Sequence, residues 1–73
     1  MITIRPSSNA QLELVRTALA TSSNFDLRRL FVVETDDGLT LRGSVSSYYH
    51  KQLAQETALA VADVPVVNAI DVA

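Results

Sequence analysis

The chain has 73 residues, of which six are Lys or Arg and eight are Asp or Glu, and it has no cysteine. This length suits one domain, which we expect to span residues 1–73. The lack of cysteine excludes disulfides, zinc–thiolate sites and thiol catalysis. A net charge of −2 argues against binding to nucleic acid and weakens attraction to anionic lipid headgroups. No stretch approaches the ~20 apolar residues that cross a bilayer, so we do not expect a transmembrane protein.

The first twelve residues, MITIRPSSNAQL, contain no basic segment followed by an apolar run. They therefore predict neither a signal peptide nor a membrane anchor. We expect a cytoplasmic location if the chain is complete, and the periplasm or envelope if it was excised from a longer precursor. Ile2 and Ile4 alternate with polar residues before Pro6, a pattern that fits either a short extra N-terminal strand or a partly ordered tail.

A first helix is expected to begin at a capping box formed by Ser8 and Gln11. The polar cluster 21–24 should end it, because these side chains compete for helical hydrogen bonds. Phe25 and Leu27 are then expected to return to the core from the connecting loop. Within the helix, apolar residues recur at helical spacing: Leu12, Val15 and Leu19.

The segment 31–45, FVVETDDGLTLRGSV, predicts a β-hairpin. Apolar and polar residues alternate on both sides of an Asp-Gly pair, which is the strongest short-range hairpin signal. We expect the turn at Asp36, Asp37 and Gly38, and we expect Phe31 and Val33 to face the helices. The opposite face of the sheet would then stay uncovered, with Leu30, Val32, Val67 and Ala69 lying among Glu34, Thr40, Arg42 and Asp71.

A second helix should follow, capped by Ser46 or Ser47 and running to about Ala62, before Pro65 stops it. Its expected buried face consists of His50, Leu53, Ala54, Thr57, Ala58 and Val61. Its outer face consists of Tyr48, Gln52, Gln55 and Leu59. A closing strand then places Val66, Asn68, Ile70 and Val72 on one face. The predicted fold is α+β, in the order α-β-β-α-β, with two helices packed on one face of a three-stranded mixed sheet.

These motifs resemble the BON domain, a small bacterial module of osmotic-stress, outer-membrane and nodulation-type proteins. The resemblance covers about residues 8–72. Its carriers are the string DG-x-T-L-x-G-x-V over 37–45, the ending V-x-N-x-I-x-V over 66–72, and Val15, Leu19, Ala54, Ala58 and Val61. The junction 62–65 departs from the Gly-Val pair usual in the family. Asp63 is expected to replace that glycine, either in a left-handed conformation or by bonding its own backbone.

The resemblance implies a binding role. The family is associated with phospholipid or membrane-surface attachment and with protein–protein contacts, and it has no established catalytic residues. The sequence itself gives no catalytic, cofactor or metal site. Asp36 and Asp37 are explained by turn geometry, no serine–histidine–acid set is recognisable, and a lone histidine makes a poor metal site. For His50 we expect a packed, hydrogen-bonded side chain rather than a ligand or pH sensor.

We therefore expect a non-enzymatic binding module. Its partner would be another protein or a second copy, with phospholipid headgroups as the alternative. Tyr48 and Lys51 at a helix start suit a protein partner or a lipid interface, whereas Tyr49 is expected to cover the end of the core. The candidate interaction surface consists of Val32, Arg42, Tyr48, Lys51, Leu59 and Val67.

Overall fold

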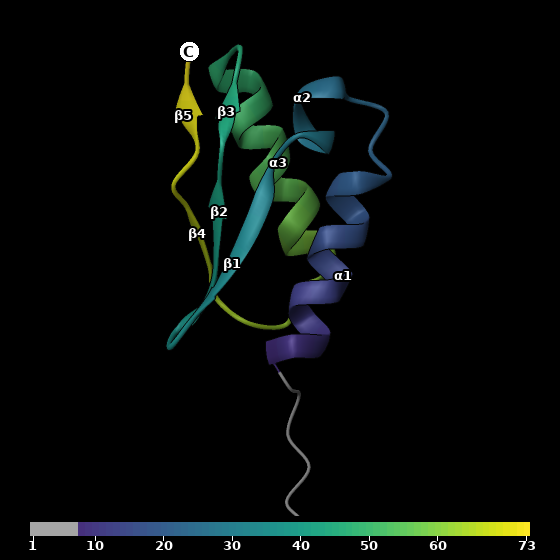
Figure 1. Ribbon diagram of the computed structural model, residues 1–73, viewed down its shortest axis with the longest axis vertical. Coiled ribbons are helices and arrows are strands. Elements are labelled where there is room, and N and C mark those ends of the chain that lie inside the picture. The colour runs from purple at the N-terminus through teal and green to yellow at the C-terminus, as the bar shows by residue number, and fades with distance from the viewer. Residues whose placement is uncertain (1–7) are drawn as a thin grey trace, which may run out of the picture.

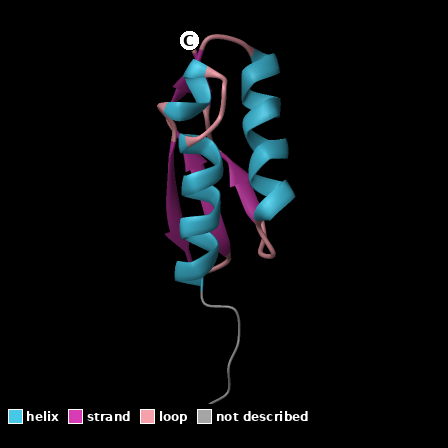
Figure 2. Ribbon diagram, turned by 90° about the vertical axis from the view of Figure 1, so that its right-hand side faces the viewer, coloured by secondary structure: helices cyan, strands magenta, loops and turns pink. Residues whose placement is uncertain are grey.

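The computed structural model describes residues 8–73 of the chain, so the possible strand at 2–4 lies outside the described residues. Two long helices pack on one face of a small sheet (Figures 1 and 2). The elements, in chain order, are α1 (Ser8–Ala20), α2 (Phe25–Arg28), β1 (Phe31–Thr35), β2 (Gly38–Arg42), β3 (Ser44–Val45), α3 (Tyr48–Val61), β4 (Val66–Asn68) and β5 (Asp71–Val72).

The main sheet has three strands in the order β1-β2-β4. β1 and β2 are antiparallel, whereas β2 and β4 are parallel, so the mixed three-stranded sheet and the α+β class are confirmed. The short helix α2 was not predicted, and β3 and β5 were predicted as parts of the longer strands that include β2 and β4. α2 follows α1, and β3 and β5 form a separate two-stranded parallel pair. Within the described residues, no helix is long and apolar enough to cross a membrane.

The core lies between the two long helices and the sheet. Leu39 and Leu41 of β2 are fully buried, and Ala54 and Ala58 of α3 are also fully buried, which lets that helix approach its neighbours closely. α3 begins after Ser47, whose Oγ accepts the backbone N–H of His50 at 3.2 Å, so the predicted cap is confirmed. The remaining core residues are Val15, Leu19, Leu27, Leu30, Val45 and Ile70.

The hairpin turn lies within the predicted segment 36–38. Asp36 and Asp37 form it, and Gly38, with φ at +145°, begins β2 opposite Thr35. Directly paired residues of antiparallel strands share a face, so Val32, opposite the buried Leu41, must face the helices.

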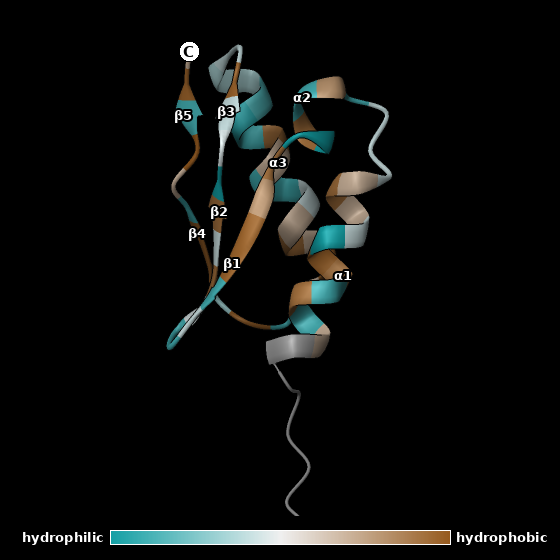
Figure 3. Cartoon of the chain, viewed as in Figure 1, coloured by the Kyte–Doolittle hydropathy of each residue, from teal (hydrophilic) through white to brown (hydrophobic). Residues whose placement is uncertain are grey.

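The predicted orientation of β1 is therefore wrong. Phe31 and Val33 are 55% and 38% exposed, whereas Val32 packs against the core and Leu30 is buried. Figure 3 shows β1 coloured hydrophobic along most of its length and hydrophilic only toward the turn, so hydropathy alone does not distinguish its two faces.

The junction between α3 and β4 is held by a long-range hydrogen bond. The backbone N–H of Asp63 donates to Gln11 Oε1 at 2.6 Å, and Gln11 is 7% exposed. Gln11 thus makes a tertiary contact that the sequence did not predict. Among the described residues only Gly38 and Gly43 have positive φ, so the left-handed conformation, one of the two alternatives given for Asp63, is wrong.

α2 is a single helical turn that packs against one end of the core through Leu27. Asn24 Oδ1 accepts the backbone N–H groups of Asp26 and Leu27, at 2.9 and 3.3 Å, which starts the turn. Leu27 is fully buried, as predicted, but Phe25 is 62% exposed and lies outside the core. Leu27 is the only one of the four α2 residues that is buried.

Candidate functional site

The open face of the three-stranded sheet carries exposed apolar side chains on both of its outer strands. Val33, Thr40 and Val67 lie in one row across β1, β2 and β4. Phe31 pairs with Arg42 in the next row. Both long helices lie on the other side of the sheet, so no described element covers this face (Figures 1 and 2).

Exposure within this face depends on the strand. Val67 and Phe31 on the outer strands are 54% and 55% exposed, and Val33 is 38% exposed. Thr40, on the central strand, is only 7% exposed because the side chains of the flanking strands cover it. We call Phe31, Val33, Thr40, Arg42 and Val67 the open sheet face.

The six predicted interaction residues do not form one surface. Arg42 and Val67 lie on the open sheet face, where they were expected. Val32 is half-buried against the core and is removed from the candidate surface. The other three lie on α3, in the layer on the far side of the sheet: Tyr48 is 77% exposed, Leu59 is 49% exposed and Lys51 is half-buried. Tyr49 is 70% exposed and does not cover the core as expected.

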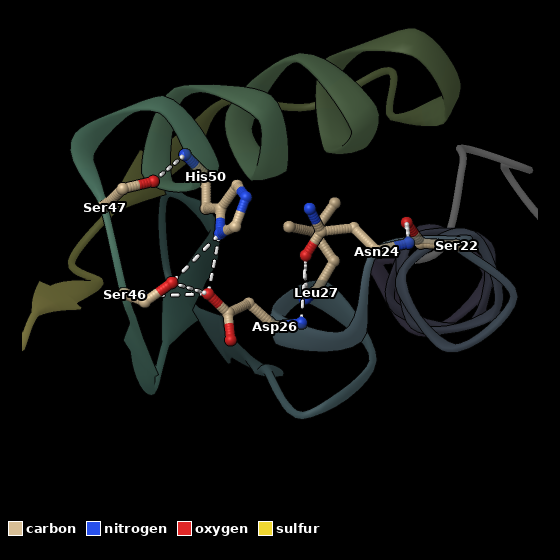
Figure 4. A network of polar contacts seen from close by, with 7 residues as sticks. All are labelled: Ser22, Asn24, Asp26, Leu27, Ser46, Ser47 and His50. Atoms are coloured by element: carbon tan, nitrogen blue, oxygen red, sulfur yellow. Dashed lines mark hydrogen bonds and ion pairs between the residues drawn. The ribbon is translucent and has the colours of Figure 1, made fainter.

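A polar cluster that the sequence did not reveal joins α2, α3 and the turn after β3 (Figure 4). Asp26 Oδ2 accepts the backbone N–H and the hydroxyl of Ser46, at 2.8 and 2.7 Å. His50 Nδ1 lies 2.7 Å from the same oxygen and 3.3 Å from Ser46 Oγ. His50 therefore has the packed, hydrogen-bonded role predicted for it.

These contacts favour the charged form of the Asp26 carboxylate. The Ser46 hydroxyl, the Ser46 backbone N–H and His50, in that order, lower the pKa of Asp26 from 3.8 to about 2. The Asp26 and His50 side chains are 18% and 26% exposed, so solvent screens their contact only in part.

The cluster brings together a serine, a histidine and an acid, yet its geometry does not suit nucleophilic catalysis. In a catalytic triad the serine and the acid bind opposite nitrogens of the imidazole. Here both contact Nδ1, which must donate because a carboxylate only accepts, so it cannot take the proton of Ser46. The adjoining depression is ≈ 230 Å³, below the ~300–1,000 Å³ usual for small-molecule pockets.

A third group of side chains lies on α2. The exposed ring of Phe25 has the guanidinium carbons of Arg28 and Arg29 at 5.6 and 5.7 Å from its centroid. Arg28 Nη1 also donates to the carbonyl of Ser22 at 3.0 Å. We call Phe25, Arg28 and Arg29 the α2 cluster. Across the described residues, no three His, Cys, Asp or Glu side chains are grouped as a metal site would require.

The family model of the BON domain matches residues 8–73. The chain belongs to the BON domain family. No curated protein sequence matches it. The match begins at the first residue of α1 and includes β5, so every described element belongs to the BON domain. Membership of this family is consistent with a binding module. A binding module contacts its partner through exposed surfaces rather than through a packed group such as the Asp26 cluster.

Proposed function

We propose that this BON domain is a non-enzymatic module that binds another protein through its open sheet face. The supporting observation is the exposure of Phe31, Val33 and Val67 on one face of the sheet, on the two strands that flank β2. Contiguous exposed apolar side chains usually mark a partner surface, whereas single ones need no explanation.

The composition of this face also fits a protein partner. An aromatic residue and an arginine, here Phe31 and Arg42, are enriched at protein interfaces. The three strands beneath them are hydrogen-bonded to one another and backed by the core, so the face is rigid and loses little entropy on binding. The exposed tyrosines of α3, Tyr48 and Tyr49, lie at its start and the exposed Leu59 and Val61 at its end, and we assign them no separate function.

This proposal predicts a site-specific crosslink. A photoreactive amino acid at position 67 is expected to capture a protein in cells that naturally make the chain, and Phe31→Ser should reduce the yield several-fold. The same amino acid at position 13, an exposed site on α1, is the control. Equal capture at positions 67 and 13, or capture that Phe31→Ser leaves unchanged, would contradict the proposal.

The α2 cluster supports a second candidate function, attachment to an anionic phospholipid surface. An exposed aromatic ring flanked by two arginines can enter the headgroup region while the guanidinium groups meet phosphate. Each basic residue near such a surface contributes about 1 kcal/mol, so two arginines give weak binding that depends on salt. The net charge of −2 opposes this attraction.

Vesicle co-sedimentation tests this second function. At low salt the chain is expected to pellet with phosphatidylglycerol vesicles, and the double variant Arg28→Gln/Arg29→Gln should lose most of that binding. Arg16→Gln removes an exposed arginine from another surface and should bind as the unmodified chain does. No pelleting of the unmodified chain, or equal losses in both variants, would reject phospholipid attachment through α2.

A further inference from the structure

β1 has hydrogen-bonding groups that no described strand uses. Among the described strands its only neighbour is β2, so it is an edge strand of the described sheet. Figure 2 shows β1 at the left margin of the sheet, with no helix along its outer side. An unpaired edge of this kind is a template for another strand.

The hydrogen bonds of β2 show which groups of β1 are unused. On the β4 side, Leu39 N–H donates to the Pro65 carbonyl, and the Leu41 carbonyl accepts from Ala69 N–H, both at 3.0 Å. Because successive residues of a strand direct their N–H and C=O groups to opposite sides, Thr40 between them must bond β1.

Thr40 pairs with Val33, so Val33 directs its backbone groups toward β2. The residues on either side of it, Val32 and Glu34, therefore direct their N–H and C=O groups outward, away from the sheet. The free edge of β1 thus offers two donors and two acceptors in alternation.

We propose that a second copy of this chain pairs antiparallel with β1 about a two-fold axis at Val33. In this register Val32 lies opposite Glu34 of the second copy, and the reverse pair is identical. Both pairs are of the hydrogen-bonded type, so every outward N–H and C=O group of Val32 and Glu34 finds a partner. The two three-stranded sheets become one sheet of six strands.

The charges favour this register and this partner. A shift of the axis to Glu34 would place two carboxylates directly opposite, which is destabilising. With the axis at Val33, the Glu34 side chain of the second copy lies on the helix side of the sheet, above Val32. Val32 lines a depression of ≈ 210 Å³ between α1 and β1 that Arg16 also lines, so the carboxylate meets a guanidinium group.

Arg16 is available for this contact. Its present partner is Glu13 on the same helix, with Nη1 and Oε1 3.1 Å apart and both side chains more than half exposed. Exposed pairs of this kind contribute little to stability, so exchange for Glu34 of the second copy costs little. The dimer uses the edge of the sheet and leaves the open sheet face free, so it is independent of the proposed function.

Two variants that reverse the charge at position 34 or at position 16 test the proposed dimer. Glu34→Arg and Arg16→Glu should each raise the dissociation constant of the homodimer about tenfold, because each creates two like-charge contacts. An equimolar mixture of the two variants should form a heterodimer at least as stable as the unmodified dimer, since opposite charges then face each other at both contacts. Sedimentation velocity across micromolar to millimolar concentrations measures all three, and failure of the mixture to associate overturns this register.

Amide exchange gives a second readout that docking at the open sheet face would not produce. With rising concentration, the N–H groups of Val32 and Glu34 should exchange more slowly, whereas that of Val33, already bonded to β2, should not change. Glu34→Pro removes an outward donor without breaking a β1–β2 bond and should abolish the dimer while circular dichroism stays unchanged. A chain that stays monomeric at millimolar concentration, or a dimer that Glu34→Pro leaves intact, overturns the proposal.

Discussion

Replacing Gly38 with alanine is expected to destabilise the domain by about 2–4 kcal/mol. The φ angle of Gly38 is +145°, a conformation that residues with a side chain rarely adopt. An added Cβ would also collide with the carbonyl oxygen of Pro65, which accepts the N–H of Leu39 at the start of the β2–β4 pairing. A domain of this size has a total stability of roughly 4–11 kcal/mol, so the loss would be a large part of it.

Urea denaturation of Gly38→Ala and Gly43→Ala separates the cost of a side chain at positive φ from the cost of the collision with the Pro65 carbonyl. Gly43→Ala also places a side chain at positive φ, but its nearest obstacle is the flexible end of Leu30, 2.8 Å from the added Cβ. It is expected to cost about 1–2 kcal/mol, less than Gly38→Ala, because a side chain can move aside and a paired backbone carbonyl cannot. Equal losses in the two variants would show that the approach of Pro65 contributes nothing.

Acidification is expected to weaken the domain through Asp26. The folded-state pKa of Asp26, about 2, lies below its ordinary value of 3.8, so the unfolded chain binds the proton more readily. The contribution of Asp26 to the free energy of unfolding is therefore present above about pH 4 and is lost as the pH falls toward about 2. Asp26→Asn should remove this part of the pH dependence.

Thermal unfolding, followed by circular dichroism between about pH 4 and about pH 2, tests whether Asp26 causes this loss of stability. Ser46→Ala is the graded control, because it removes the hydroxyl donor and keeps the Ser46 backbone N–H and His50 in place. It should reduce the acid-induced loss without abolishing it. If Asp26→Asn loses as much stability on acidification as the unmodified chain, the cluster does not set this pH response.

The orientation of β1 shows where periodicity was insufficient. Phe31, Val32 and Val33 are all apolar, so alternation alone did not say which of them face the core. The two-residue turn determines the register of the hairpin, because it pairs Val32 with Leu41 and Val33 with Thr40. Cross-strand partners share a face, and the buried leucines of β2 therefore fix the orientation of β1. Applied to the sequence, this rule would have placed Phe31 and Val33 on the open sheet face.

The Asp26 cluster had no comparable signal in the sequence. Asp26 and His50 are 24 positions apart, and Ser46 is an ordinary residue before a helix. They meet because Asn24 starts α2 and the burial of Leu27 fixes that turn against the core. A contact of this kind depends on how separate elements dock, which local residue patterns do not record.

The sequence by itself determined the order of the main helices and strands, the Ser47 cap, the alanines of α3 that approach the core and membership of the BON domain family. These features rest on local spacing, which the residues fix directly. Only the tertiary structure decided which face of the sheet is free, which backbone groups of β1 are unused and which side chains surround Asp26. These depend on strand register and on the docking of distant segments, and both are set by the packing of the whole chain.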